Sequence, residues 1–154
     1  MGLYTVTAHV PMGQNVGASP DGRKAGTPLA DGGMSPMYGR DKIGPTAVLK
    51  SVSKIPSRIT GNGSLLNMKF LPSFFNTEGD REKFSTFLKA FVRLPIHHIQ
   101  FNVVSREDLL NAKKDPEKYR GLTVRVAGYS AYFTDLTEDM QDEIIARTSY
   151  DSIA

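Results

Sequence analysis

The chain of 154 residues contains no cysteine, and this absence limits its chemistry. Without a thiol it forms no disulfide and holds no thiolate-bound metal. It also lacks any apolar run close to the ~20 residues that cross a membrane as a helix. Residues 1–10 lack the charged start and the apolar core of a secretory signal. These absences predict a soluble, cytoplasmic protein without a metal site.

The chain also lacks a strong excess of one charge. It has 19 basic and 16 acidic residues, a formal net charge of +3, and the basic residues are scattered. No basic stripe interleaves with aromatic residues, so nucleic-acid binding is not indicated. The length suits one domain with a modest core. We therefore expect a single domain over residues 1–154 with neither nucleic acid nor membrane among its partners.

A glycine- and proline-rich segment covers residues 13–45. Pro20-Asp21-Gly22 is a turn signal, because proline presets φ and glycine accepts positive φ. About 30 residues without regular structure are rare in a compact domain. The segment is too apolar for a flexible linker, since it contains Val16, Leu29, Met34, Met37 and Tyr38. We expect residues 1–60 to be ordered but irregular and to pack on a partner chain, with Arg23 either salt-bridged to that partner or facing water.

Residues 61–154 carry the patterns of a compact module. Helices are expected over residues 80–92 and 138–148, with a further one starting at 106, and an earlier helix over 46–55. Strands are expected over residues 65–70, 98–104, 122–126 and 129–133. The clearest helix has an apolar stripe at positions i, i+3, i+4 and i+7 that predicts core packing: Phe84, Phe87, Leu88 and Phe91. The layout predicts a mixed α/β piece.

Polar side chains give weaker signals. Ser105 and Asp108 resemble a capping box, and Thr137 is placed to cap the last helix, whose final turn would hold Arg147. An acidic cluster there is expected to face solvent: Asp135, Glu138, Asp139, Asp142 and Glu143.

The strand over residues 98–104 alternates Ile99, Phe101 and Val103 with His98, Gln100 and Asn102, which predicts a half-buried strand.

The chain offers no pattern for a bound metal or nucleotide. Its histidines are His9, His97 and His98. Neighbouring strand residues point to opposite faces, so His97 and His98 would not converge on one ion and are expected to be polar strand positions. Gly61-Asn62-Gly63 lacks the third glycine and the preceding strand of a dinucleotide fingerprint.

Gly128 stands between two strand-like stretches rich in β-branched and aromatic residues. We expect it at the tip of the tight turn that joins them. A glycine lacks Cβ, so its Cα can become planar without a side-chain clash. From this short stretch alone, Gly128 would be interpreted as an ordinary hairpin glycine, because short motifs match by chance.

Three blocks of sequence resemble the C-terminal portion of glycyl radical enzymes. They are residues 20–33 (Pro-Asp-Gly-Arg and the following loop), residues 100–104 with Asp115-Pro116-Glu117-Lys118-Tyr119, and residues 124–133 continued by 141–148. The variant Ala-Gly-Tyr-Ser-Ala-Tyr-Phe around Gly128 is similar to the dehydratase and lyase branch.

This resemblance implies a fold that is the C-terminal part of an α/β barrel, with the radical on Gly128 as its cofactor. It implies that Arg125, Val126, Ala127 and Tyr129 support the loop. A radical S-adenosylmethionine activating enzyme, which holds the iron–sulfur cluster, would take the hydrogen from Gly128. The radical would then pass to a cysteine. Oxygen in air would cleave the backbone at Gly128, so the resemblance implies a role in anaerobic metabolism.

The family's catalytic cysteine lies upstream of the portion that this chain resembles. The first hypothesis is therefore a small subunit that works with a larger partner carrying the cysteine, and it predicts a sizeable exposed apolar patch around the Gly128 hairpin. The second is a spare-part protein that repairs an oxygen-cleaved enzyme. The initial methionine favours a natural small protein, but an excised domain is a third interpretation. The fourth is a non-catalytic binding module.

Overall fold

The computed structural model describes residues 1–153, which contain five α-helices and five strands. The helices are α1 (His9–Gln14), α2 (Pro45–Val52), α3 (Glu78–Arg93), α4 (Arg106–Lys114) and α5 (Glu138–Ala146). The strands are β1 (Asn67–Phe70), β2 (Gln100–Val103), β3 (Thr123–Arg125), β4 (Ser130–Tyr132) and β5 (Ser149–Tyr150). Short 3₁₀ helices lie at Ser57–Ile59, Pro72–Phe75, Pro116–Tyr119 and Phe133–Asp135.

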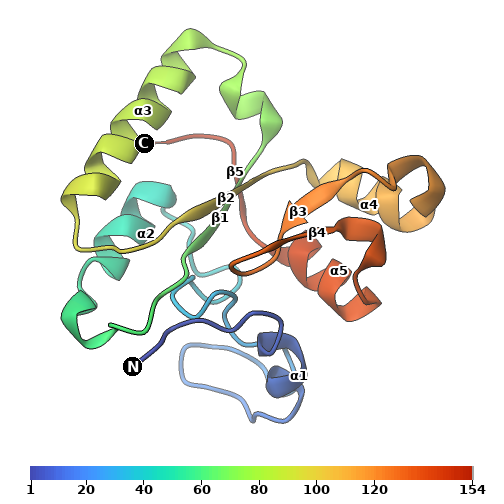
Figure 1. Ribbon diagram of the computed structural model, residues 1–154, viewed down its shortest axis with the longest axis horizontal. Helices are drawn as coiled ribbons and strands as arrows, with labels where there is room; N and C mark the ends of the chain where they lie inside the picture. The colour runs from blue at the N-terminus through green and yellow to red at the C-terminus, as the bar shows by residue number, and fades with distance from the viewer. Residues whose placement is uncertain (154) are drawn as a thin grey trace.

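A parallel sheet with the strand order β2–β1–β5 forms the centre of the molecule (Figure 1). Asn67 lies opposite Gln100, and Phe70 lies opposite both Val103 and Tyr150. Parallel neighbours need a crossover, which α3 supplies between β1 and β2. Helices α2 and α3 lie on one side of the sheet, and α4, α5 and the antiparallel β3–β4 hairpin lie on the other (Figure 1). The predicted mixed α/β fold is confirmed.

The sheet face toward α2 and α3 is apolar. Met68 and Phe70 project from β1 into a buried cluster with Leu49 of α2 and Phe87 of α3. The Phe70 ring lies 5.5 Å from the Phe84 ring in an edge-to-face arrangement, a geometry that aromatic pairs prefer. Burying each such side chain contributes about 1.5–3 kcal/mol. The phenylalanine stripe of α3 is therefore core, as its spacing predicts.

A second apolar cluster lies on the other side of the sheet. Val124 and Val126 of the hairpin pack there with Leu109 of α4, Ile144 of α5 and Phe133. This cluster attaches the hairpin to the two helices. It therefore positions the turn at the end of the hairpin.

Side-chain caps fix where two helices begin. The Asp80 N–H donates to Thr77 Oγ1 at 3.1 Å, and the Asp108 N–H donates to Ser105 Oγ at 3.0 Å. Such caps contribute about 1 kcal/mol each. Thr137 is the N-cap residue of α5, as predicted, but its side chain makes no capping bond. Helix α5 also ends at Ala146, so Arg147 lies just beyond it and not in its last turn.

The first 60 residues are largely irregular, with α1 and α2 as their α-helices. Arg23 is buried and donates to the carbonyl oxygens of Val16, Gly17, Lys24 and Thr27, with a distance of 2.7 Å to Thr27. The expectation that Arg23 faces water or a partner is therefore wrong: it closes a loop of its own chain, because a guanidinium carries enough donors for several carbonyls.

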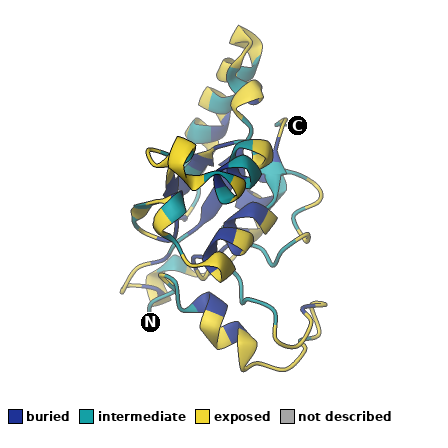
Figure 2. Ribbon diagram, turned by 90° about the vertical axis from the view of Figure 1, so that its right-hand side faces the viewer, coloured by how far each residue is buried: buried dark blue, intermediate teal, exposed yellow. Residues whose placement is uncertain are grey.

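Burial is concentrated in the sheet and in the inward faces of the helices, whereas the loop beyond α1 is mostly exposed (Figure 2). Among residues 1–153, no helix combines the length and the apolar character needed to cross a membrane.

Candidate functional site

Gly128 lies at the tip of the β3–β4 hairpin, as predicted. Thr123 pairs with Tyr132, and the Val126 N–H donates to the Tyr129 carbonyl oxygen at 2.9 Å. Gly128 has φ +87° and is exposed, and Ala127 before it has no positive φ. These are the φ signs of a type II turn, which places glycine at its third position.

Backbone conformation, more than space, demands glycine at residue 128. A Cβ built there would lie 3.3 Å from Leu65 Cδ1, the mobile end of a side chain that can shift by a few tenths of an ångström. The positive φ is disfavoured for any residue with a Cβ, by about 1–2 kcal/mol.

The hairpin is covered by its own chain. Val126 and Ala127 are buried, and Tyr129 is half-buried against the second apolar cluster. Among residues 122–133, Tyr132 is the large hydrophobic side chain that is exposed, at 53%. The prediction of a sizeable exposed apolar patch around the hairpin is therefore wrong, because α4, α5 and the sheet already cover the apolar hairpin residues.

A buried carboxamide binds the amide of Gly128. The Gly128 N–H donates to Gln100 Oε1 at 3.1 Å, and Arg125 Nη2 donates to the same oxygen at 3.1 Å. Gln100 Nε2 donates to Asn67 Oδ1. Asn67 Nδ2 in turn donates to the Val126 carbonyl oxygen at 3.2 Å and to Asp31 Oδ2 at 2.6 Å. The turn is thus tied to β2 through Gln100 and to β1 through Asn67.

Asn102 makes a second tie between the hairpin and β2. Its Nδ2 donates to the Arg125 carbonyl oxygen, and the Arg125 N–H donates to its Oδ1, both at 2.7 Å. Arg147 Nη1 also donates to the Arg125 carbonyl oxygen, at 3.2 Å. Arg125, predicted to support the loop, lies in this network. It is the main chain of Arg125 that Asn102 and Arg147 hold.

The polar face of β2 is the buried one. Gln100 and Asn102 are buried, whereas Val103 is 51% exposed. The predicted alternation is correct, but a half-buried strand would usually bury its apolar side. Here Phe101 packs on the first apolar cluster, while Gln100 and Asn102 face the hairpin. The result is a polar layer between the sheet and the second apolar cluster.

Buried charges complete that layer. Arg147 donates to Glu143 through Nε at 2.9 Å and Nη2 at 2.8 Å, and its Nε lies 3.6 Å from Asp31 Oδ2. Tyr38 donates its hydroxyl to Glu143 Oε1. Burial opposes ionisation of Glu143, but the nearby His9 ring and Arg147 outweigh it and lower its pKa to about 2. Burial raises the pKa of Asp31, and the charge of Arg147 only partly opposes this. The prediction that Glu143 faces solvent is wrong.

The histidines and Lys69 differ in their surroundings. His9 is fully buried, with Nε2 at 3.4 Å from Glu143 Oε2. His97 is exposed and His98 is half-buried, and both precede β2, which begins at Gln100, so the prediction that they are strand positions is wrong. Lys69 is buried and donates to the carbonyl oxygens of Ile144 and Ile145 at 3.0 and 3.3 Å. Burial lowers the pKa of Lys69 to about 8.

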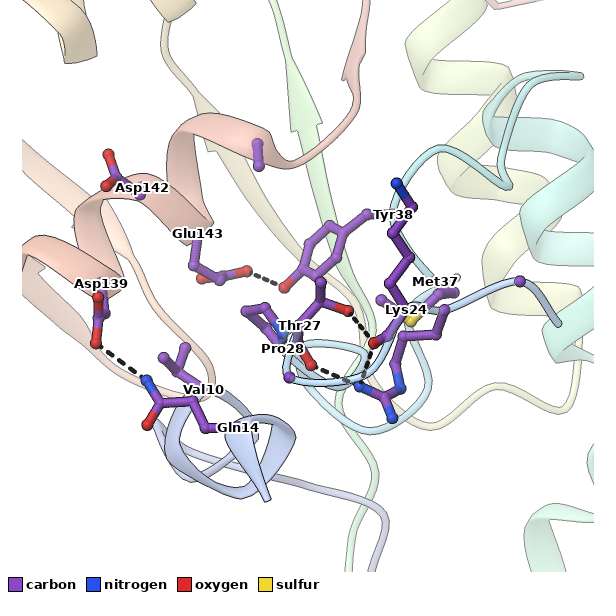
Figure 3. A pocket seen from close by; sticks show the side chains of 14 residues that line it. Val10, Gln14, Lys24, Thr27, Pro28, Met37, Tyr38, Asp139, Asp142 and Glu143 are labelled. Atoms are coloured by element: carbon purple, nitrogen blue, oxygen red, sulfur yellow. Dashed lines mark hydrogen bonds between the residues drawn. The ribbon is translucent and has the colours of Figure 1, made fainter. Parts of the chain in front are cut away.

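A cavity of about 480 Å³ lies between α1, residues 22–28 and α5, and Gly128 does not line it. Figure 3 shows Glu143 of α5 turned toward Tyr38, and Gln14 of α1 turned toward Asp139, with a 3.2 Å hydrogen bond between that last pair. Across residues 1–153, no three histidine, aspartate or glutamate side chains are grouped to hold a metal ion.

The sequence alone did not indicate the residues that anchor Gly128: Asp31, Asn67, Gln100 and Asn102. The available signal was a polar residue at alternate positions of two neighbouring strands, Asn67 with Lys69 and Gln100 with Asn102.

Comparison with known proteins places the chain in a family. The glycine radical family model matches residues 30–134, more than half of the chain. The chain is 51% identical to the probable dehydratase YbiW of Escherichia coli (strain K12), over 97% of this chain and 18% of that protein. It is 48% identical to an isethionate sulfite-lyase of Oleidesulfovibrio alaskensis, over 96% of this chain and 18% of that protein.

Solved structures agree with the sequence comparison. The glycerol-bound form of the B12-independent glycerol dehydratase from Clostridium butyricum matches 97% of this chain with a TM-score of 0.92 and 47% identity, and 19% of that chain is covered. The chain thus spans about a fifth of the length of these relatives and corresponds to their C-terminal part, within an α/β barrel. It belongs to the glycyl radical family, as a glycyl radical domain of the dehydratase and lyase branch.

Proposed function

We propose that Gly128 carries an unpaired electron on its Cα atom and that this chain supplies the radical for a dehydration or a lyase reaction. The supporting observation is the state of Gly128: an exposed turn tip at φ +87° whose amide is bound by a buried side chain. Its supports are Arg125, through hydrogen bonds, and Val126, Ala127 and Tyr129, through packing.

The chemistry consists of two hydrogen-atom transfers. In the first, the Cα–H bond of Gly128 breaks homolytically, and the hydrogen atom goes to a radical S-adenosylmethionine activating enzyme, as in other members of the family. In the second, the Cα radical takes a hydrogen atom from a thiol. The Cα–H bond forms again, the S–H bond breaks, and the unpaired electron moves to sulfur. The sulfur radical then acts on the substrate.

The thiol must come from outside these 154 residues, because the chain has no cysteine. We propose a larger protein that carries the cysteine, with this chain as its radical-bearing subunit. The missing cysteine supports this role, whereas the hairpin offers no wide apolar patch as a docking surface. The alternative is a spare part that replaces the cleaved C-terminal part of a complete enzyme. A partner without its own glycine hairpin supports the first role, and a partner that has one supports the second.

Electron paramagnetic resonance tests the proposal. The anaerobic chain is incubated with the activating enzyme, S-adenosylmethionine and reductant, with and without the larger protein. We expect a doublet from one Cα proton that disappears in Gly128→Ala. No signal with the larger protein and several activating enzymes of the family would overturn the radical role and leave the binding-module interpretation.

A further inference from the structure

We propose that Gln100 is a positioning residue for the radical at Gly128: its side-chain oxygen fixes the amide plane that the unpaired electron must share. This inference rests on the proposed function. It is carried by the bond from the Gly128 N–H to Gln100 Oε1, at 3.1 Å. An exposed turn tip would ordinarily leave this N–H to water. Here a side chain that is only 5% exposed takes it instead.

The carboxamide of Gln100 is itself held at both ends. Its oxygen has two lone pairs, and they accept from the Gly128 N–H and from Arg125 Nη2. Its nitrogen donates to Asn67 Oδ1. Asn67 is fixed by its bonds to Asp31 and to the Val126 carbonyl oxygen. The hydrogen bonds therefore run from Gly128 through Gln100 and Asn67 back to Val126 in the same turn. Rotation of the Gln100 amide would break all three of its bonds.

This arrangement acts on the radical in two ways. A Cα radical is stabilised when its half-filled orbital overlaps the lone pair of the preceding amide nitrogen, and overlap requires a fixed peptide plane. An acceptor on the N–H also draws the proton toward itself and makes the nitrogen a better electron donor. Both effects are lost if Gln100 loses its oxygen, whereas the apolar packing of Val126 and Ala127 stays in place.

Two substitutions separate the parts of this arrangement. Gln100→Met keeps a similar volume and removes the acceptor. Gln100→Glu keeps an oxygen for Gly128 and Arg125 and loses the donor to Asn67. Thermal melting of each variant comes first, and Gln100→Ala replaces Gln100→Met if the latter unfolds.

The first test needs no radical. Amide hydrogen exchange, followed by nuclear magnetic resonance, is compared at Gly128 and at Val126, whose N–H bonds to Tyr129 within the hairpin. In Gln100→Met we expect the Gly128 amide to exchange about three- to tenfold faster, with Val126 unchanged. In Gln100→Glu, which keeps the acceptor but loses the bond to Asn67, we expect a smaller acceleration at Gly128 than in Gln100→Met and no change at Val126. Unchanged exchange at Gly128 in Gln100→Met, or equal acceleration at Val126, would overturn the positioning role.

The second test measures the radical itself under anaerobic activation. We expect Gln100→Met to give a changed proton splitting and a shorter-lived signal, and Gln100→Glu to lie between Gln100→Met and wild type. A wild-type spectrum and lifetime in Gln100→Met would overturn the inference and leave the proposed function standing. No signal in wild type would overturn the proposed function, and the radical part of the inference with it.

Discussion

Gly128→Ala tests the radical assignment most directly, because its effect on stability can be worked out beforehand. The new methyl group would lie 3.3 Å from Leu65 Cδ1, which can move aside. The backbone bond to Gln100 does not depend on a side chain at residue 128. What remains is the cost of holding alanine at φ +87°, about 1–2 kcal/mol.

That cost corresponds to a fall in melting temperature of about 2–8 °C for a chain of this size. Gly39→Ala is a matched control, because Gly39 also has a positive φ, +70°, and a Cβ there would meet nothing within 4 Å. We expect the two variants to melt at similar temperatures. Only Gly128→Ala should lose the radical signal after anaerobic activation.

The outcomes separate chemistry from folding. Loss of the signal in both variants would mean that a weakened fold, and not the missing hydrogen atom of Gly128, prevents activation. A normal radical yield in Gly128→Ala would refute the assignment outright. A fall in melting temperature much above 8 °C would show that a methyl group at residue 128 disturbs more than the backbone and Leu65.

Further predictions concern the polar layer and a helix cap. Arg147→Met leaves Glu143 buried without its ion pair and should lower the free energy of unfolding in urea by about 3–5 kcal/mol, while Lys118→Met at an exposed pair should change it little. Ser105→Ala should cost about 1 kcal/mol in the same assay. The pKa of Lys69 is lowered from 10.5 to about 8. From pH 8 to 9.5 the folded chain therefore loses this proton before the unfolded chain does, and wild type should gain stability relative to Lys69→Met; a constant difference would contradict this. The pKa of Glu143 is lowered from 4.5 to about 2, so the advantage of wild type over Glu143→Gln should be complete above about pH 4.5 and be lost toward pH 2.

Local patterns in the sequence predicted the elements that local physics controls. The periodic phenylalanines gave α3, Ser105 gave the start of α4, and the flanks of Gly128 gave the hairpin. Helix α1 was missed, because Pro11 and Gly13 interrupt any helical pattern in its six residues. The short strand β5 at Ser149–Tyr150 was missed as well, since it exists only through pairing with β1.

The candidate site was predictable only at its tip. Gly128 is marked by its neighbours in sequence. In contrast, Gln100 lies 28 residues before Gly128, to which it bonds, and Asn67 lies 59 residues before Val126, to which it bonds. A polar residue on a strand ordinarily faces water. Which face becomes covered depends on where the hairpin and α5 pack, and a pattern within one strand does not contain that information.

The two kinds of contact at the hairpin have different consequences for the turn. Apolar packing of Val124 and Val126 favours attachment but is not directional, so it would tolerate small rotations of the hairpin. Hydrogen bonds weaken steeply when their angles change. The bonds from Gln100 and Asn102 therefore set the orientation of the turn. A chain that only had to bury a hairpin could use apolar residues at both positions. The costly choice of buried amides is explained if the direction of the Gly128 backbone matters to its chemistry.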